Sequence, residues 1–118
     1  MNLTRIKDGQ DLELLVTVPL IDGTPFQLDS ADWDLHIYGI FSRVDIESRG
    51  NVITSVGPTS ANVEIKDNQI LVYIKSSKVP LGPGGLSITM TIYAPHEKFE
   101  DELQVMKTID SPIDVILV

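Results

Sequence analysis

The chain has 118 residues and a mass of 13.0 kDa, which is typical of one domain with one hydrophobic core. It contains no cysteine, so disulfides, thiolate metal sites and cysteine nucleophiles are excluded. Nine Lys and Arg against 17 Asp and Glu give a formal net charge of -8, which argues against nucleic acid or an anionic membrane as a partner. No run of about 18 apolar residues could span a bilayer, and no secretory signal is evident at the N-terminus.

Alternation of apolar residues with a period of two predicts β-strands in the first half of the chain. Leu12 to Leu20 alternates, although Pro19 cannot donate to a ladder and so marks an edge or the end of the strand. Asp22-Gly23 then favours a tight reversal. In the next strand, one face is predicted to consist of Trp33, Leu35, Ile37, Gly39 and Phe41. Its second face is partly apolar, so we expect cover on both faces.

Shorter strands are predicted at Val52 to Val56, at Val63 to Lys66 and around Ile70 to Ile74. The last two flank Asp67-Asn68 and are expected to form a hairpin. Pro80 to Gly85 is too rich in Gly and Pro for a helix or a ladder, so it is predicted to be a turn.

The clearest strand follows this turn, from Leu86 to Ala94. Leu86, Ile88, Met90, Ile92 and Ala94 are predicted to face the core, and Ser87, Thr89, Thr91 and Tyr93 to face away from it. For Lys98 to Met106 we expect a loop or one helical turn at most, with a weak strand signal at Leu103 and Val105. Ile113, Val115 and Leu117 predict a last strand.

Strands that recur about every ten residues, with no helical pattern between them, predict an all-β fold. We interpret residues 1–118 as a single immunoglobulin-like antiparallel β-sandwich domain. A small β-barrel is the alternative, because both architectures bury every second side chain. Trp33 is the only tryptophan, and its place on an alternating strand favours the core over a ligand site.

The sequence offers little support for catalysis, so we predict no catalytic residues and no enzymatic activity. His36 and His96 lie far apart and neither has the HxxxH spacing of a zinc site. No serine lies in a GxSxG elbow, and neither histidine has an acid and a nucleophile in a recognisable pattern. Gly82, Gly84 and Gly85 invite comparison with a phosphate-binding loop, but no Lys-Ser/Thr pair follows and prolines remove amide donors.

Carboxylates gather in two acidic segments that could share a calcium ion at one end of a sandwich. These segments contain Asp29, Asp32 and Asp34 in one case and Glu97, Glu100, Asp101 and Glu102 in the other. Neither matches the EF-hand pattern, and acidic loops are usually just solvated. We therefore predict no metal site and no cofactor.

The order of several turn motifs is more informative than any one of them. Lys7-Asp8-Gly9-Gln10 precedes the first long strand, and Asp22-Gly23-Thr24-Pro25-Phe26-Gln27-Leu28 reverses the chain before the Trp33 strand. Gly84-Gly85-Leu86 enters the late strand. This order resembles the immunoglobulin-like N-terminal domain of upper baseplate proteins and related fibre-attachment domains of tailed bacteriophages and prophages.

The resemblance implies a non-enzymatic virion protein, made in the cytoplasm of the bacterial host, that attaches a tail, baseplate or head fibre. Its partners would be other virion proteins (fibre, baseplate or capsid subunits), and it would form homo-oligomers in the assembly. In that family the sandwich usually anchors a longer chain, so ending at Val118 favours a stand-alone adaptor, collar or decoration subunit, or an excised domain. Assembly needs exposed edges or apolar patches, and Tyr38, Ile40 and Tyr73 fall on nominally outward positions.

A second hypothesis from a different class is a carbohydrate-binding β-sandwich module, with or without a requirement for calcium. Its motivation is the acidic segments together with three aromatic residues, Trp33, Tyr38 and Tyr93. Such a module needs aromatic faces that are exposed to sugar rings.

Overall fold

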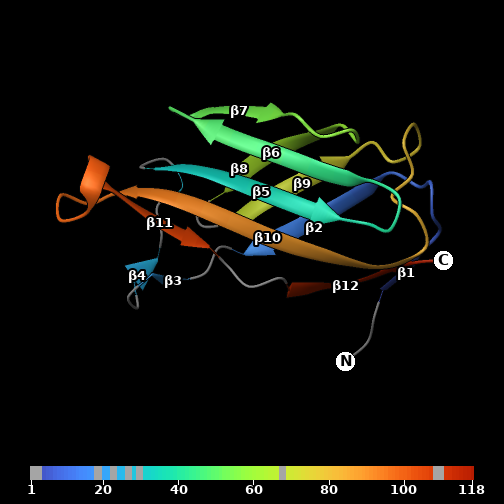
Figure 1. Cartoon of the computed structure of the whole chain (residues 1–118). Coiled ribbons are helices and arrows are strands. Elements are labelled where there is room, and N and C mark those ends of the chain that lie inside the picture. Colours follow the sequence, from blue (N-terminus) through green and yellow to red (C-terminus); the bar gives the residue numbers. More distant parts are fainter. Residues whose placement is uncertain are drawn as a thin grey trace.

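Figure 1 shows the computed structural model of the chain, which describes residues 4–17, 20–21, 24–25, 28, 31–66, 69–107 and 111–118. Its strands are β1 (Thr4–Ile6), β2 (Leu12–Thr17), β3 (Leu20–Ile21), β4 (Thr24–Pro25), β5 (Asp32–Tyr38), β6 (Arg43–Arg49), β7 (Val52–Ser55), β8 (Ala61–Lys66), β9 (Gln69–Ile74), β10 (Gly84–Pro95), β11 (Leu103–Lys107) and β12 (Ser111–Leu117). One 3-10 turn, Glu100–Glu102, precedes β11. No helix in these residues is long and apolar enough to cross a lipid bilayer.

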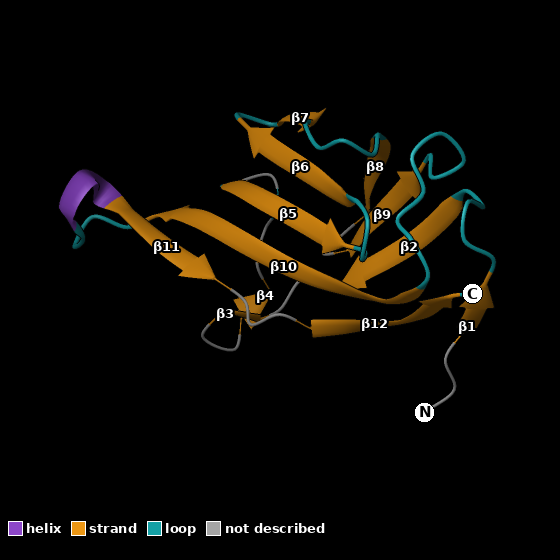
Figure 2. Cartoon of the chain, turned by 45° about the vertical axis from the view of Figure 1, so that its right-hand side comes forward, coloured by secondary structure: helices purple, strands orange, loops and turns teal. Residues whose placement is uncertain are grey.

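Two sheets stack on one another, which confirms the predicted sandwich, while β3 and β4 form a separate two-stranded ribbon. The larger sheet has the order β1-β12-β10-β5-β6-β7, with β11 also paired to β10, and the smaller sheet has the order β2-β9-β8. All pairs are antiparallel except β1 with β12, which is parallel. The sheets do not close on one another, so the barrel alternative is wrong. Figure 1 shows the smaller sheet behind the larger one, and in the turned view of Figure 2 it lies to the right of β5 and β6.

The core lies between the two sheets and is built from the alternating positions that the sequence predicts. Trp33 is fully buried, as expected of a core residue, and Leu86, Met90 and Ile92 of β10 are also buried. Ile88 of the same strand is only half-buried. The remaining buried apolar side chains come from both sheets and from the connecting residues Leu28 and Leu81: Leu12, Leu14, Leu28, Leu35, Ile37, Val44, Ile46, Ile70, Val72, Ile74, Leu81 and Leu117.

Two predictions about β5 need correction, and the neighbouring strand was missed. Phe41 does not lie on the buried face, because β5 ends at Tyr38 and the chain turns there, leaving Phe41 75% exposed. In the described part of the chain, no further sheet covers the second face of β5, which carries half-buried polar side chains such as Asp34 and His36. Strand β6 was not predicted at all, although Val44 and Ile46 are buried, since the alternating charges of Asp45 and Glu47 obscured its pattern.

The predicted reversals agree with the strand pairs that flank them. Strands β8 and β9 pair antiparallel around Asp67-Asn68, and β3 pairs with β4 around Asp22-Gly23. These two dipeptides, and also Asp29, lie outside the described residues. Residues 80–83 form the expected connection, but the predicted turn extended to Gly85, whereas Gly84 and Gly85 are the first two residues of β10 and pair with β12. The Lys98 to Met106 region has the single helical turn followed by β11.

Candidate functional site

The most exposed apolar feature is the turn between β5 and β6, which we call the tip surface and define as Tyr38, Ile40 and Phe41. Ile40 is 69% exposed and Phe41 75%, whereas Tyr38 is 37% exposed. A shallow hollow of about 270 Å³ lies here and is also lined by Arg43 and Pro58. Large apolar side chains that share one turn are a common feature of protein-binding sites.

The backbone of the tip is held in place by the connection that leads into β10. Gly39 N–H donates to the Ser42 carbonyl at 2.9 Å, and Phe41 N–H donates to the Leu81 carbonyl at 2.9 Å. A Cβ atom on Gly39 would collide with the backbone and side chain of Leu81. Only glycine therefore allows this close approach, which fixes the direction in which Ile40 and Phe41 point.

A buried threonine ties the tip to a second neighbouring segment. Thr59 is fully buried, and its hydroxyl lies 2.6 Å from the hydroxyl of Ser42 and donates to the Val79 carbonyl at 3.4 Å. Its N–H donates to the Arg43 carbonyl at 3.2 Å. Because these contacts join three segments at one point, the tip is a preformed surface, which lowers the entropy lost on binding.

Beside the tip, the outward face of β5 and β6 carries a polar cluster. Asp45 accepts a hydrogen bond from Arg43 Nε at 2.8 Å, and its other oxygen lies 2.8 Å from His36 Nδ1. Burial acts to raise the pKa of the Asp45 carboxyl, but the hydrogen bonds from Arg43 and His36 outweigh it and lower this pKa below its usual value. The His36 ring also stacks on Tyr38, with ring centroids 6.0 Å apart.

This cluster gives His36 an acidic neighbour that the sequence did not reveal, since the pair forms across the strands. A catalytic triad also needs a nucleophile on the imidazole, and the interactions described for His36 involve only Asp45 and Tyr38. The cluster lies on the face of a sheet beside the tip hollow. It therefore acts as a cross-strand bridge that supports the base of the tip.

At the opposite end of the same face, Asp34 joins β5 to β6 and β10. Its carboxylate lies 2.8 Å from Arg49 Nη2 and accepts a hydrogen bond from the Tyr93 hydroxyl at 2.8 Å. The guanidinium of Arg49 lies over the Tyr93 ring, 5.2 Å from its centroid. The hydrogen bond to Asp34 raises the pKa of Tyr93 above its usual value. Asp34 thus forms an ion pair with Arg49 and a hydrogen bond with Tyr93.

The remaining predicted metal and glycine motifs do not gather into a site. Among the described residues, no group of three or more His, Asp or Glu side chains could hold a metal ion. His96 accepts a hydrogen bond from Lys98 N–H at 3.2 Å and packs edge-on against Phe99. Gly82 N–H donates to the Asp8 carboxylate at 3.0 Å, so this glycine-rich turn already binds an acidic side chain of its own chain.

The structure brings two of the three predicted surface residues together and separates the third. Tyr38 and Ile40 belong to the tip surface, whereas Tyr73 lies on β9, on the outward face of the smaller sheet. Its hydroxyl donates to Glu64 at 3.1 Å. Phe41 is the tip residue that the sequence reasoning assigned to the core. Gly39, directly before Ile40 and Phe41, is the signal that could have placed it in a turn.

No protein-family model, curated protein or solved structure matches the chain. The fold and the site define it as a β-sandwich of two largely antiparallel sheets, with an apolar turn at one end that is hydrogen-bonded to a neighbouring segment.

Proposed function

We propose that the chain is a non-enzymatic virion structural protein of a tailed phage or prophage, an adaptor that attaches a tail, baseplate or head fibre. The order of turn motifs supports this proposal, because it resembles the fibre-attachment domains described above. The fold class is the one that the resemblance implies. On this proposal the protein is made in the host cytoplasm and ends up in the virion, next to other copies of itself and to fibre, baseplate or capsid subunits.

The tip surface is the structural feature that best supports the proposed docking role. Ile40 and Phe41 expose most of their apolar area, yet their backbone is fixed by Leu81 and Gly39. A fixed apolar projection binds with little loss of conformational freedom and gains from burial against a partner. Tyr38 and Arg43 at its base have the two side-chain types that are enriched at protein interfaces.

The test is binding of the purified chain to virion components from the encoding phage or prophage, with the bound proteins identified by mass spectrometry. We expect capture of a fibre, baseplate or capsid subunit, and loss of that capture in the double variant Ile40→Ser/Phe41→Ser. The matched control is Val52→Ser on β7, which removes an apolar side chain that is 66% exposed and lies outside the tip.

Two results would contradict the proposal: no virion protein bound by the wild-type chain, or equal binding by the tip variant. Neighbouring genes give an independent test of the class, since portal, tail or capsid genes beside the coding sequence are expected.

The carbohydrate-binding alternative has less support. Trp33 is fully buried and so cannot stack on a sugar, and the Arg49 guanidinium lies over one face of the half-buried Tyr93 ring. Tyr38 is the aromatic residue of that hypothesis that stays exposed. Binding on a glycan array, or a fall in melting temperature when a calcium chelator is added, would revive this alternative.

A further inference from the structure

The smaller sheet has an open edge at β2. Strand β2 pairs with β9 along its whole length, from Leu12 with Ile74 to Thr17 with Gln69. On its other side, no strand of the described chain pairs with it. Constant-type immunoglobulin sandwiches place the first strand there as the fourth strand of this sheet. In this chain the first strand, β1, pairs instead with β12 of the larger sheet.

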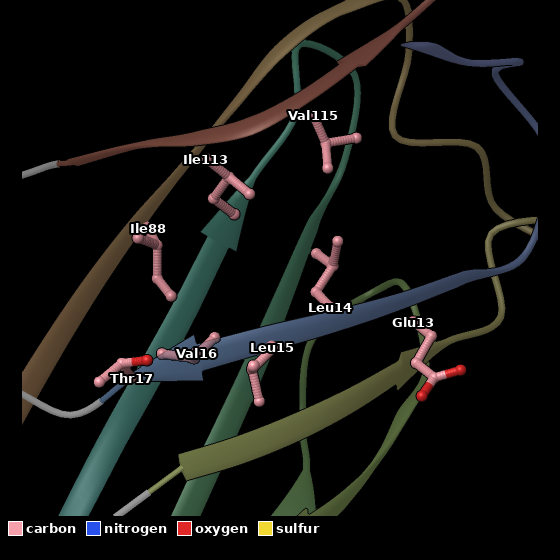
Figure 3. A pocket seen from close by; sticks show the side chains of 8 residues that line it. All are labelled: Glu13, Leu14, Leu15, Val16, Thr17, Ile88, Ile113 and Val115. Carbon is pink, nitrogen blue, oxygen red and sulfur yellow. The ribbon is translucent and has the colours of Figure 1, made fainter. Parts of the chain in front are cut away.

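A groove with both apolar and polar lining runs along this open edge, between β2 and β12. Its volume is about 390 Å³. Figure 3 shows Leu14 and Val16 of β2 on one side and the side chains of β10 and β12 on the other. The side chains that line it are Glu13, Leu14, Leu15, Val16, Thr17, Ile88, Ile113 and Val115. Val16, Ile88, Ile113 and Val115 are only half-buried, although the sandwich pattern directs them inward.

The groove and the open edge together have the form of a site for one additional strand. The backbone of an inserted segment would pair with β2, and every second side chain would enter the groove, as in other cases of strand addition. Strand β2 has six residues, which corresponds to roughly 20 Å of extended chain at about 3.3 Å per residue. A segment of similar length therefore covers the edge.

A second copy of this chain is a poor occupant. Two β2 edges could pair with each other, but each copy already directs Leu12 and Leu14 of β2 into its own core. Those side chains could not also fill the groove of the other copy. The groove requires an extended segment that has no sheet of its own, so we assign it to a different protein.

Charge further specifies this segment. Glu13 lies on the exposed face of β2 at one end of the groove. Within the described part of the chain, no cationic group lies within ion-pair distance of its carboxylate. The chain also has a net charge of -8, which favours a basic partner.

We propose that the groove between β2 and β12 binds an extended segment of another protein, apolar at alternate positions and carrying Lys or Arg beside Glu13, which becomes the fourth strand of the smaller sheet. This site is separate from the tip surface. The inference holds whether or not the chain is a virion protein.

The first experiment titrates the isotope-labelled full chain with a synthetic peptide, acetyl-Lys-Val-Thr-Val-Thr-Val-amide, and follows binding by NMR. Amide shifts are expected along residues 12–17, with methyl shifts at Ile88, Ile113 and Val115 and slower hydrogen exchange in β2. Two N-methylated peptides are the controls for strand pairing, each methylated on one alternate set of amides. The peptide methylated on the amides that face β2 should bind about tenfold or more weakly, because its hydrogen bonds to β2 are lost. The peptide methylated on the other amides should keep its affinity.

The second experiment changes the protein. Ile113→Trp fills the groove and should abolish peptide binding, whereas Val52→Trp adds the same ring at an exposed site of the larger sheet and should leave it unchanged. Glu13→Lys should reverse the preference for the peptide with a terminal Lys over a version with a terminal Glu. Because Glu13 is exposed, this variant should fold normally.

Four results would overturn the proposal. One is the absence of any shift in β2, and another is equal binding of both N-methylated peptides, which would indicate adsorption without strand pairing. A third is a free protein whose β2 amides are all protected from exchange, which would show that this chain itself fills the edge. The fourth is a concentration-dependent dimer that forms through β2.

Discussion

The two sheets differ in how completely their strands are paired. In the larger sheet β12, β10, β5 and β6 each have neighbours on both sides, whereas in the smaller sheet only β9 does. The outward face of the larger sheet also carries cross-strand ion pairs at Asp34 and Asp45. The smaller sheet has a hydrogen bond from Tyr73 and an ion pair of Asp11 at its end. The larger sheet thus holds the fold together, and the smaller one leaves backbone and apolar surface for a partner.

The largest loss of stability is expected from a substitution at the centre of the larger sheet. Met90→Asp should prevent folding, because Met90 is buried and the change places an unpaired charge in the core, at a cost of roughly 4 kcal/mol or more. Thr89→Asp, one position away on the outward face, should be far milder. Circular dichroism and urea unfolding of both variants measure the difference. Equal effects would overturn the inward and outward assignment of β10.

The next largest loss of stability is expected from a substitution in the turn that links the larger sheet to the tip surface. Gly39→Ala should destabilise the fold by about 1–3 kcal/mol and shift the resonances of Ile40 and Phe41, because the new Cβ collides with Leu81. Gly85→Ala is the matched control, since a Cβ there meets no atom within 4 Å. Thermal unfolding and NMR spectra of the two variants provide the measurement. A Gly39→Ala protein as stable as the control would show that the tip is loosely held.

Through Asp45, the free energy of unfolding should depend on pH. The pKa of the Asp45 carboxyl is lower in the folded than in the unfolded chain, so the unfolded chain takes up the proton first as pH falls. The stabilisation is therefore lost as pH falls below about 4. Asp45→Asn should cost roughly 1–3 kcal/mol at neutral pH and remove part of that dependence. Urea unfolding between pH 7 and pH 2 measures both effects. The exposed Glu97→Gln is the control, and an identical pH profile in both variants would contradict this role.

The smallest effect belongs to the end of the smaller sheet, where Lys75 Nζ lies 2.6 Å from an Asp11 oxygen. The hydrogen bonds from Lys75 and from Ser77 lower the pKa of Asp11 from 3.8 to about 2. Asp11→Asn should scarcely alter stability, since this pair is exposed to solvent. Carbon-detected NMR titration should place the Asp11 midpoint below 3.8 and move it towards 3.8 in Lys75→Ala. A midpoint that does not move would show that the ion pair does not form in solution.

Sequence reasoning predicted the parts of the fold that depend on local alternation. Leu86 to Ala94 and Leu12 to Thr17 alternate because each strand buries one face, and their inward residues are buried or half-buried as predicted. The alternation of β6 was missed because the charged residues Asp45 and Glu47 interrupt its apolar pattern, and Asp45 is held there by His36 of β5 and Arg43 of β6. Phe41 was wrongly assigned to the buried face because alternation does not show where a strand ends.

The groove could not be predicted from the sequence, for a different reason. Leu14, Val16, Ile113 and Val115 look like ordinary core residues, and they are inward-facing in the structure. What leaves a groove beside them is the order of strands, in which β1 joins β12 and not β2. Strand order depends on contacts between residues far apart in the chain, so no short pattern encodes it.

The parallel pairing of β1 with β12 has a mechanical consequence. Thr4 lies beside Val115 and Ile6 beside Leu117, and Val118 N–H donates to the Ile6 carbonyl at 2.9 Å. A force that pulls the beginning of β1 away from the end of β12 acts along both strands in opposite directions. It must therefore shear several hydrogen bonds at once, because the geometry does not allow them to open one after another. A domain tethered in that way would resist tension better than one gripped across a hairpin.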